Sequence, residues 1–290
     1  MITVGFCVDR AYLLPMLVTL VSIADTHELC LRRTISLRVL SPDISRSEAL
    51  TVEDIVRRLG FQGVAFRCLL PPPNIEIVNG PYISTTTYLR FAFDDSFVSD
   101  PFLLYLDADV MICGEMMTPF NQLGSHAIGA VVDEINHTVG TSPALPGFIK
   151  KYPIYHGRPY FNAGVLWLRT AALRSTNEGC LSALRARKHI HFNDQDALNM
   201  WLLTSEVGVA VPALFNRFDL DRLLQESDWV KRVALPLPPD TGTHAVHFIG
   251  KIKPWHRRCP GVPSVRLYGR ALRNTRIQVA RVRGGSLEIF

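Results

Sequence analysis

The sequence predicts an α/β protein built on a mostly parallel central sheet that is flanked by helices. Short runs of apolar and β-branched residues alternate along the chain with longer segments whose apolar residues recur at helical spacing. The first three runs are separated by segments long enough for crossover helices, which is typical of a parallel sheet with right-handed connections. With 290 residues, 48% of them hydrophobic, the chain is long enough to bury a large core.

The N-terminal part of the sequence predicts three strands and two helices. The strands are expected at residues 2–8, 34–40 and 63–70, and the helices at residues 13–25 and 45–60. In the second helix, Ser45 stands where an N-cap is expected and Gly60 where the helix should end. Three consecutive prolines at 71–73 end the third strand.

The rest of the chain continues the alternation. A short helix is expected at residues 84–93 in spite of its three threonines. Strands are expected at residues 101–110, 126–134, 160–169, 208–214 and 243–250, and helices at residues 170–187 and 193–204. The run that starts at Pro101 is mainly apolar up to Leu106, which favours a strand buried on both faces.

The net charge of +5 originates at the C-terminus. Residues 266–290 hold six arginines and one glutamate, whereas residues 1–265 hold 25 basic and 25 acidic side chains. We therefore expect a domain at residues 1–260 and an arginine-rich tail at residues 261–290. The tail is interpreted as solvated, or as a patch for an anionic membrane or an anionic acceptor. Nucleic acid is the weakest interpretation, because the charge forms no basic groove.

The six cysteines are scattered and include no Cys-x-x-Cys pair, so neither a zinc site nor a thioredoxin-like redox pair is predicted. Buried free thiols in a reducing compartment are expected instead. The first residues lack the basic start and apolar centre of a secretory signal, and no apolar stretch is long enough to span a bilayer. We expect a cytoplasmic protein.

Two aspartates, Asp107 and Asp109, follow five apolar or aromatic residues. The same spacing occurs at 194/196 and at 219/221, so it carries little weight alone, and we interpret the pair at 219/221 as surface. In an open α/β sheet, ligands bind beyond the carboxyl ends of the parallel strands, and alternate residues of an extended chain point the same way. Two carboxylates there suit Mn²⁺ or Mg²⁺. A strand end that faces solvent is the alternative.

A third metal ligand is expected from another strand end, where the sequence offers His247. Imidazole beside two carboxylates fits Mn²⁺ well, whereas a histidine with its hydrogen bonds satisfied in the core is the alternative. After it, Gly250 allows close approach of the backbone, and cationic donors for a diphosphate follow at Lys251, Lys253 and His256.

Six sequence blocks occur in order, namely FCVDRAY, TTTYLRF, LLYLDADV, YFNAGVL, NDQDALN and HFIGKIKPWH. In this order and at these separations they resemble the retaining glycosyltransferases of family eight, which include bacterial lipooligosaccharide galactosyltransferases and glycogenin. The resemblance covers residues 2–259. It implies a GT-A fold with a Rossmann-like nucleotide-binding sheet and a UDP-hexose donor used with Mn²⁺.

The resemblance implies a role for each matching residue. The metal would be bound by Asp107, Asp109 and His247. The nucleotide would contact Cys7, Val8 and Asp9 through uridine, the backbone of Ala108 through ribose, and Gly250 and Lys253 through the diphosphate. The donor sugar would face Arg90 and Asn162. Asp133 matches a site-facing aspartate of that family, and a turn at the strand end explains it nearly as well.

Asp194 and Gln195 match family positions near the anomeric carbon. Retention can proceed through a covalent intermediate or by attack on the same face, and the sequence leaves both open. Glutamine is a poor nucleophile, so we favour a positioning role for Gln195 and keep Asp194 as the covalent candidate. An N-cap of the following helix by Asn193 or Asp194 is the alternative interpretation.

Two positions depart from the family pattern. Ala11 stands where relatives often carry an asparagine that contacts the nucleotide, and Tyr82 stands where the galactosyltransferases have an acceptor-contacting histidine. The acceptor of those enzymes is therefore not assigned to this chain. Variable loops such as residues 138–157 are expected to form the acceptor site.

The leading hypothesis is a retaining, Mn²⁺-dependent transferase that moves glucose or galactose from UDP to a hydroxyl of a glycan, a lipid-linked or a small-molecule acceptor. A non-catalytic sugar-nucleotide-binding protein is one alternative, although it would be expected to have lost a metal ligand. A metal-dependent sugar nucleotidyltransferase is another, disfavoured because no Gly-rich phosphate loop lies near the N-terminus.

Overall fold

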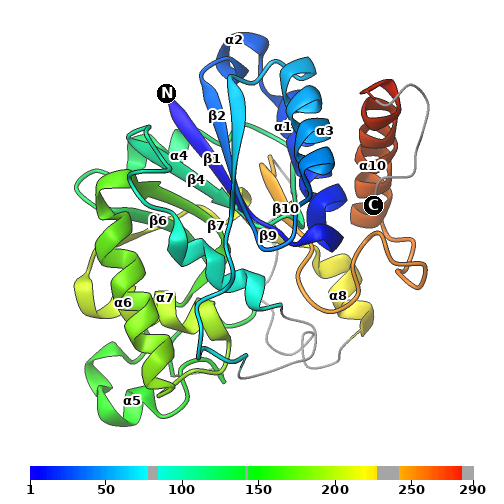
Figure 1. Cartoon of the computed structure of the whole chain (residues 1–290). Helices are drawn as coiled ribbons and strands as arrows, with labels where there is room; N and C mark the ends of the chain where they lie inside the picture. Colours follow the sequence, from blue (N-terminus) through cyan, green and yellow to red (C-terminus); the bar gives the residue numbers. More distant parts are fainter. Residues whose placement is uncertain (78–83, 141–142, 227–241, 283–290) are drawn as a thin grey trace.

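Seven strands form the central sheet of the computed structural model, which describes residues 1–77, 84–140, 143–226 and 242–282 (Figure 1). The strand order is β3-β2-β1-β4-β7-β6-β8. The strands are β1 (Ile2–Cys7), β2 (Ile35–Ser41), β3 (Gly63–Cys68), β4 (Phe102–Leu106), β6 (Ile128–Val132), β7 (Phe161–Arg169) and β8 (Gly208–Val211). Each overlaps a strand that the sequence predicts.

One strand of this sheet, β7, runs against its neighbours. The other neighbouring pairs are parallel, whereas β7 is antiparallel to both β4 and β6. The predicted α/β fold with a mostly parallel sheet is thus confirmed. Because β7 is reversed, its first residues lie at the carboxyl edge of β4, where Val165 faces Leu106 in the register. This reversal brings Asn162 and Gly164 beside the aspartates that follow β4.

A second sheet of three strands, in the order β5-β10-β9, lies at the same edge. Its strands are β5 (Val110–Ile112), β10 (Ala245–His247) and β9 (Arg217–Phe218). The prediction of one strand over residues 101–110 is wrong, because the chain leaves the main sheet after Leu106. A turn follows, in which the Val110 amide donates to the Asp107 carbonyl (3.3 Å). The new strand then pairs with β10 so that Val110 faces His247.

Helices cover both faces of the central sheet (Figure 1). α1 (Leu13–Thr26), α3 (Arg46–Arg58) and α10 (Pro263–Val282) pack together on one face, and α6 (Leu173–Ala186), α7 (Asn193–Ser205) and the 3-10 helix η2 (Thr85–Ala92) on the other. Alternate residues of β4 enter the two cores, with Leu104 on the α1 face and Tyr105 on the α6 face. The strand is therefore buried on both faces, as predicted.

Short helices connect these layers. They are α2 (Leu29–Arg32), α4 (Thr118–Gln122), α5 (Phe148–Lys151), α8 (Leu220–Glu226), η1 (Arg10–Tyr12), η3 (Pro153–Tyr155), η4 (Thr170–Ala172) and η5 (Ala213–Phe215). At α3 the predicted signals are present: Ser45 and Glu48 form a reciprocal capping box, and Gly60 has φ +81°. Local capping interactions therefore determine where α3 begins and ends, as the sequence predicts.

Helix α10 contains most of the predicted arginine-rich tail. Four residues, Tyr268, Ala271, Thr275 and Val279, are buried against the domain. Its exposed residues include five arginines, at positions 266, 270, 273, 276 and 281, whereas the sixth, Arg283, lies outside the described residues. None of the helices in the described part of the chain combines the length and hydrophobicity needed to cross a bilayer.

Two predictions about burial are wrong. All six cysteines are free, as expected, but only Cys180 is buried, and Cys30 and Cys68 are exposed. The Asp219 carboxylate, interpreted as surface, is buried and pairs with the buried guanidinium of Arg222. Burial raises the pKa of Asp219 to about 7, although hydrogen bonds from Arg222 oppose the shift.

Candidate active site

A cavity of about 560 Å³ lies beyond the carboxyl ends of the parallel strands. Its lining includes fifteen of the sixteen residues that the sequence places in a site, namely Cys7, Val8, Asp9, Arg90, Asp107, Ala108, Asp109, Asp133, Asn162, Asp194, Gln195, His247, Gly250, Lys251 and Lys253. The exception is His256, which does not line the cavity and accepts a hydrogen bond at Nδ1 from the Lys253 amide (3.2 Å). The lining residues come from strand ends, helices and connecting loops that lie far apart in the sequence. The fold therefore brings the predicted residues together, while their roles stay predictions.

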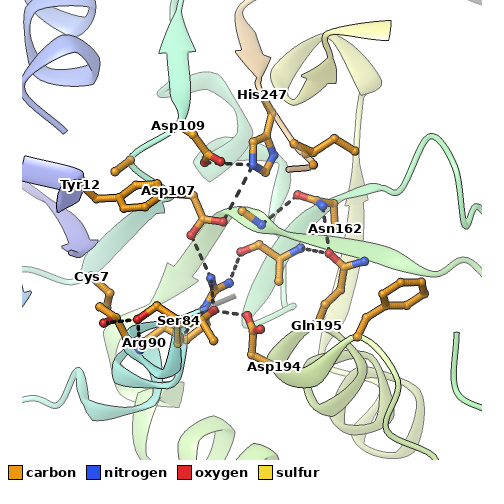
Figure 2. A pocket seen from close by; sticks show the side chains of 18 of the residues that line it. Cys7, Tyr12, Ser84, Arg90, Asp107, Asp109, Asn162, Asp194, Gln195 and His247 are labelled. Carbon is orange, nitrogen blue, oxygen red and sulfur yellow. Dashed lines mark hydrogen bonds and ion pairs between the residues drawn. The ribbon is translucent and has the colours of Figure 1, made fainter. Parts of the chain in front are cut away.

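Three candidate metal ligands meet on one side of this cavity. Ligand atoms of Asp107, Asp109 and His247 all lie within 4.8 Å of one another. His247 Nε2 lies 3.3 Å from Asp109 Oδ1 and 3.9 Å from Asp107 Oδ2 (Figure 2). Two carboxylates and an imidazole are a donor set that suits Mn²⁺, so the chemistry of these residues fits the metal.

The two carboxylates are held differently. Asp107 Oδ1 accepts hydrogen bonds from the Tyr105 hydroxyl (2.6 Å) and Arg90 Nη2 (2.9 Å), which leaves Oδ2 turned toward His247. Asp109 Oδ2 pairs with Lys253 Nζ at 2.5 Å, and Lys253 also donates to the Phe248 carbonyl (2.8 Å). Burial acts to raise the pKa of Asp109, but Lys253 and His247 outweigh it and hold that pKa well below its usual range.

Gly164 makes room for this cluster. A Cβ atom at residue 164 would lie 2.9 Å from Asp107 Oδ2 and would overlap the imidazole ring of His247. The Gly164 carbonyl also accepts a hydrogen bond from the Asp107 amide (2.8 Å). The glycine of the YFNAGVL block therefore has a steric role beneath the candidate metal site.

Arg90 forms the floor of the cavity between two carboxylates. It is buried, donates to the Ala163 carbonyl (2.6 Å), and pairs with Asp107 (2.9 Å) and Asp194 (3.0 Å). Burial opposes its charge, but both carboxylates outweigh burial and raise the pKa of Arg90. Burial raises the pKa of Asp194, and Arg90 counteracts this shift. Arg90 is thus a cation held in place by two carboxylates.

The N-cap interpretation of the NDQD block is wrong. Phe192 is the N-cap residue of α7, Asn193 Oδ1 accepts from the Tyr88 hydroxyl (3.0 Å), and Asp194 pairs with Arg90. The second aspartate, Asp196, accepts from the Phe192 amide (2.7 Å) and from the Tyr160 hydroxyl (2.7 Å). It thereby holds the chain that leads into α7, which leaves Asp194 directed into the cavity.

Three polar side chains of the cavity lining, those of Asn162, Gln195 and Asp133, are joined by hydrogen bonds. Gln195 Oε1 accepts from Asn162 Nδ2 (2.9 Å) and from the Ala163 amide (3.2 Å). Gln195 Nε2 donates to Asp133 Oδ2 (3.0 Å), whose other oxygen accepts from the amide of Ile135 (2.9 Å). Both hydrogen-bonding ends of Gln195 are therefore engaged, which supports positioning over nucleophilic attack.

This arrangement was compared with known proteins. A model described as glycosyl transferase family 8 matches residues 3–259. The chain belongs to this family. Lipopolysaccharide 1,3-galactosyltransferase of Salmonella typhimurium (strain LT2) is 31% identical over 183 residues, which cover 59% of this chain and 49% of the relative. Glycosyltransferase GlyF of Streptococcus pneumoniae serotype 4 is 24% identical over 263 residues, which cover 86% and 56%.

Solved structures have the same fold. The galactosyltransferase LgtC, solved with donor and acceptor sugar analogs, matches with a TM-score of 0.70 and 23% identity over 94% of this chain and 96% of that one. GlyE of Streptococcus pneumoniae TIGR4 matches with a TM-score of 0.68 and 17% identity over 98% and 64%. The GT-A type fold is thus confirmed. The chain spans about half the length of the curated relatives that it matches.

The end of β1 and the following turn form part of the cavity wall. Cys7, Val8 and Asp9 line it, and burial raises the pKa of the Cys7 thiol, which therefore stays neutral. Tyr12, to which the sequence assigns no role, lines the cavity and packs edge-on against Trp255 (5.7 Å between ring centroids). Ala11 is exposed.

Two parts of the sequence concern the acceptor, Tyr82 and residues 138–157. Tyr82 falls outside the described residues. Within its described residues, the segment 138–157 supplies no side chain to the cavity lining. Among the residues missed by the sequence analysis, Asn216 accepts from or donates to two site residues, His247 (3.1 Å) and Asn162 (2.8 Å). No local pattern marks it, because it follows the short helix η5 in a region of irregular chain.

Proposed function

We propose that this family 8 member is a retaining hexosyltransferase that takes glucose or galactose from a UDP-sugar with Mn²⁺. The observation that carries the proposal is the cluster of Asp107, Asp109 and His247 on the wall of the cavity, with Asp107 Oδ2 turned toward the imidazole. Bound Mn²⁺ would supply positive charge against the departing diphosphate. The other residues of the cavity would bind and orient the two parts of the donor.

The nucleotide part of the donor would lie along β1 and the turn after β4. We assign uridine to Cys7, Val8 and Asp9, ribose to the backbone of Ala108, and the diphosphate to Gly250 and Lys253. Gly250 has φ +83°, a conformation that suits a glycine and exposes backbone amides to a ligand. Lys253, which now neutralises Asp109, would provide a charge-assisted hydrogen bond to a phosphate oxygen.

The sugar part would lie between η2 and the start of α7. Arg90, Asn162 and Asp133 would orient the hexose, and Gln195 would hold them through its engaged amide. Asp194 is the carboxylate available to support positive charge at the anomeric carbon or to attack it. Its ion pair with Arg90 keeps it oriented and opposes the burial that raises its pKa.

The acceptor is proposed as a hydroxyl of a glycan, of a lipid-linked glycan or of a small molecule. Several curated relatives are named as lipopolysaccharide glucosyl- or galactosyltransferases, which favours a glycan acceptor. The alternatives of a non-catalytic sugar-nucleotide-binding protein and of a nucleotidyltransferase are less well supported, because the metal ligands, Arg90 and Asp194 lie together in one cavity.

A donor panel tests the proposal. The protein is incubated with UDP-glucose, UDP-galactose and their N-acetyl forms, with Mn²⁺, with Mg²⁺ or with EDTA, and released UDP is measured. We expect metal-dependent release that Asp109→Asn abolishes and that Asp25→Asn, an exposed aspartate of α1, leaves intact. NMR of the product should show a retained anomeric configuration; an inverted product, or no turnover of any UDP-sugar, would refute the proposal.

We further propose that α10 places the enzyme on an anionic membrane surface. At 100° per residue, Arg266, Arg270, Arg273 and Arg281 project from the side of α10 opposite its buried residues, together with the exposed Ile277. Each arginine near an anionic bilayer contributes about 1 kcal/mol. Because truncation would also remove buried Tyr268, charge substitution is the cleaner test.

Sedimentation with vesicles measures this contact. Changing the arginines at 266, 270 and 273 together to glutamine should weaken binding to phosphatidylcholine–phosphatidylserine vesicles on the order of 100-fold. A control with the same loss of charge replaces three exposed arginines elsewhere, at 33, 174 and 185. Equal binding by both variants, or equal binding to pure phosphatidylcholine, would contradict a role for α10.

A further inference from the structure

A single string of side-chain hydrogen bonds joins the candidate metal site to the candidate sugar site. It starts at His247 Nδ1, which lies 3.1 Å from Asn216 Oδ1. Asn216 Nδ2 donates to Asn162 Oδ1 (2.8 Å), Asn162 Nδ2 to Gln195 Oε1 (2.9 Å), and Gln195 Nε2 to Asp133 Oδ2 (3.0 Å). Figure 2 shows Asn162 between His247 and Gln195, which belongs to the first turn of α7.

Backbone amides fix which atom is the donor and which the acceptor in each hydrogen bond of this string. The Gly164 amide donates to Asn162 Oδ1 (2.9 Å), and the Ala163 amide donates to Gln195 Oε1 (3.2 Å). Because a backbone N–H can only donate, these two side-chain atoms must be oxygens. Asn162 then offers an acceptor to Asn216, which must turn its nitrogen toward Asn162 and its oxygen toward His247.

This direction decides the tautomer of His247. Facing an amide oxygen, Nδ1 must carry the hydrogen and donate it, so the lone pair lies on Nε2. Nε2 is the atom directed at Asp109 (3.3 Å) and Asp107 (3.9 Å). A metal-binding histidine is oriented in this way by the partner of its second nitrogen.

Contacts outside the string hold two of its members, Asp133 and Asn216. Asp133 Oδ1 accepts from two backbone amides, of Ile135 (2.9 Å) and Asn136 (2.7 Å), so the carboxylate at the far end is held in place. The residues that follow Asp133 and Asn216 form a buried ion pair, Glu134 with Arg217 (3.0 Å). The string is therefore clamped between β6 and β9 before any ligand binds.

We propose that Asn216 is a positioning residue that sets the tautomer of His247 for metal binding and, through its other end, holds Asn162 and Gln195 for the donor sugar. Asn216 is fully buried and does not line the cavity, so it acts through these neighbours. The proposal rests on the proposed function in assigning Mn²⁺ to this site. Its tests measure metal affinity and tautomer directly, apart from sugar transfer.

Two substitutions distinguish the hydrogen bond of Asn216 to His247 from its hydrogen bond to Asn162. Asn216→Ala removes both hydrogen bonds, and Mn²⁺ affinity, measured by EPR of the free ion, should fall about 10- to 100-fold. Asn216→Asp keeps an oxygen acceptor for His247 Nδ1 but sets a second oxygen against Asn162 Oδ1. Mn²⁺ affinity should then stay near the wild-type value, while the rate of transfer at saturating Mn²⁺ falls in both variants.

A matched control is Asn177→Ala on α6, where the Asn177 amide donates to the Phe93 carbonyl (2.6 Å) away from the cavity; it should keep wild-type Mn²⁺ affinity. Wild-type affinity in Asn216→Ala, or equal weakening in Asn216→Ala and Asn216→Asp, would overturn the proposal. If the proposed function fails because no UDP-sugar is turned over, the Mn²⁺ measurements still decide the role of Asn216.

A measurement on the unsubstituted protein covers the case in which the variants do not fold. In metal-free protein with ¹⁵N-labelled histidine, NMR above the titration range of imidazole should show His247 with its hydrogen on Nδ1. The signal is assigned by its loss in His247→Asn. A hydrogen on Nε2 would overturn the proposal, because Asn216 would then present no acceptor to the ring.

Discussion

Lys253→Met should make the stability of the protein depend on Mn²⁺. Lys253 and Asp109 form a buried ion pair in which the two side chains are 10% and 12% exposed. Removing one partner of such a pair leaves an uncompensated charge and costs about 3–5 kcal/mol. Because neither side chain is fully enclosed, we take about 3 kcal/mol. Methionine retains most of the side-chain volume, so the loss of charge dominates.

The expected shift in melting temperature follows from chain size. Unfolding entropy of about 2.1 cal/mol/K per residue gives roughly 0.6 kcal/mol/K for a chain of this length, so 3 kcal/mol lowers the melting temperature by about 5 °C in metal-free buffer. Mn²⁺ at 100 times its Kd contributes about 2.7 kcal/mol to the native state. It should also bind the variant more tightly, because the ammonium group of Lys253, which pairs with Asp109, no longer repels it.

Differential scanning calorimetry with EDTA and with Mn²⁺ measures both effects. The melting temperatures of wild type and Lys253→Met should differ by about 5 °C without metal and converge with Mn²⁺. Transfer activity should stay low in both buffers, since Lys253 is assigned to the diphosphate. Lys188→Met, at an exposed lysine, serves as the control. If wild type and Lys253→Met have the same melting temperature without metal, or if Mn²⁺ leaves their difference unchanged, Lys253 does not neutralise Asp109.

Three further predictions concern single residues. Gly164→Ala should lower Mn²⁺ affinity at least about 10-fold in calorimetric titration, because its Cβ would displace the His247 ring; unchanged affinity would exclude the steric role. Arg222→Met should cost about 3–5 kcal/mol in urea unfolding, and adding Asp219→Asn should recover part of that loss; simple additivity would mean that the pair is uncoupled. Ser45→Ala should cost about 1 kcal/mol in the same assay, and no loss would contradict the capping box.

Short-range patterns account for most of the elements. The apolar spacing of α1 and α3, the capping box at Ser45 and the apolar run of β4 are properties of adjacent residues, and each yields the element that the pattern predicts. Apolar spacing gave a wrong prediction where pairing with a distant strand decides the secondary structure. The run at 101–110 reads as one strand, yet β5 begins at Val110 because it pairs with β10, more than a hundred residues later.

For the site, too, some residues could be predicted from the sequence and others only from the structure. The six sequence blocks contain the predicted residues that line the cavity, except Asp133, because each block lies at or near the end of a strand or the start of a helix. Tyr12 belongs to the first block, but the sequence assigns it no role, and Asn216 belongs to no block, since the roles of both come from tertiary contacts. Asn216 is separated by 31 residues from His247 and by 54 from Asn162. Asp219 was wrongly interpreted as surface, because its partner Arg222 is recognised only once α8 is buried.

The sequence by itself determined the α/β class, the family and the chemical groups of the site. The tertiary structure decided how those groups are held, through Lys253 on Asp109, the space left by Gly164, and the direction of the amide string from Asp133 to His247. The physical reason is the range of the interactions. Periodicity and capping act within a few residues, whereas charge pairing, steric fit and hydrogen-bond direction depend on atoms that only folding brings within reach.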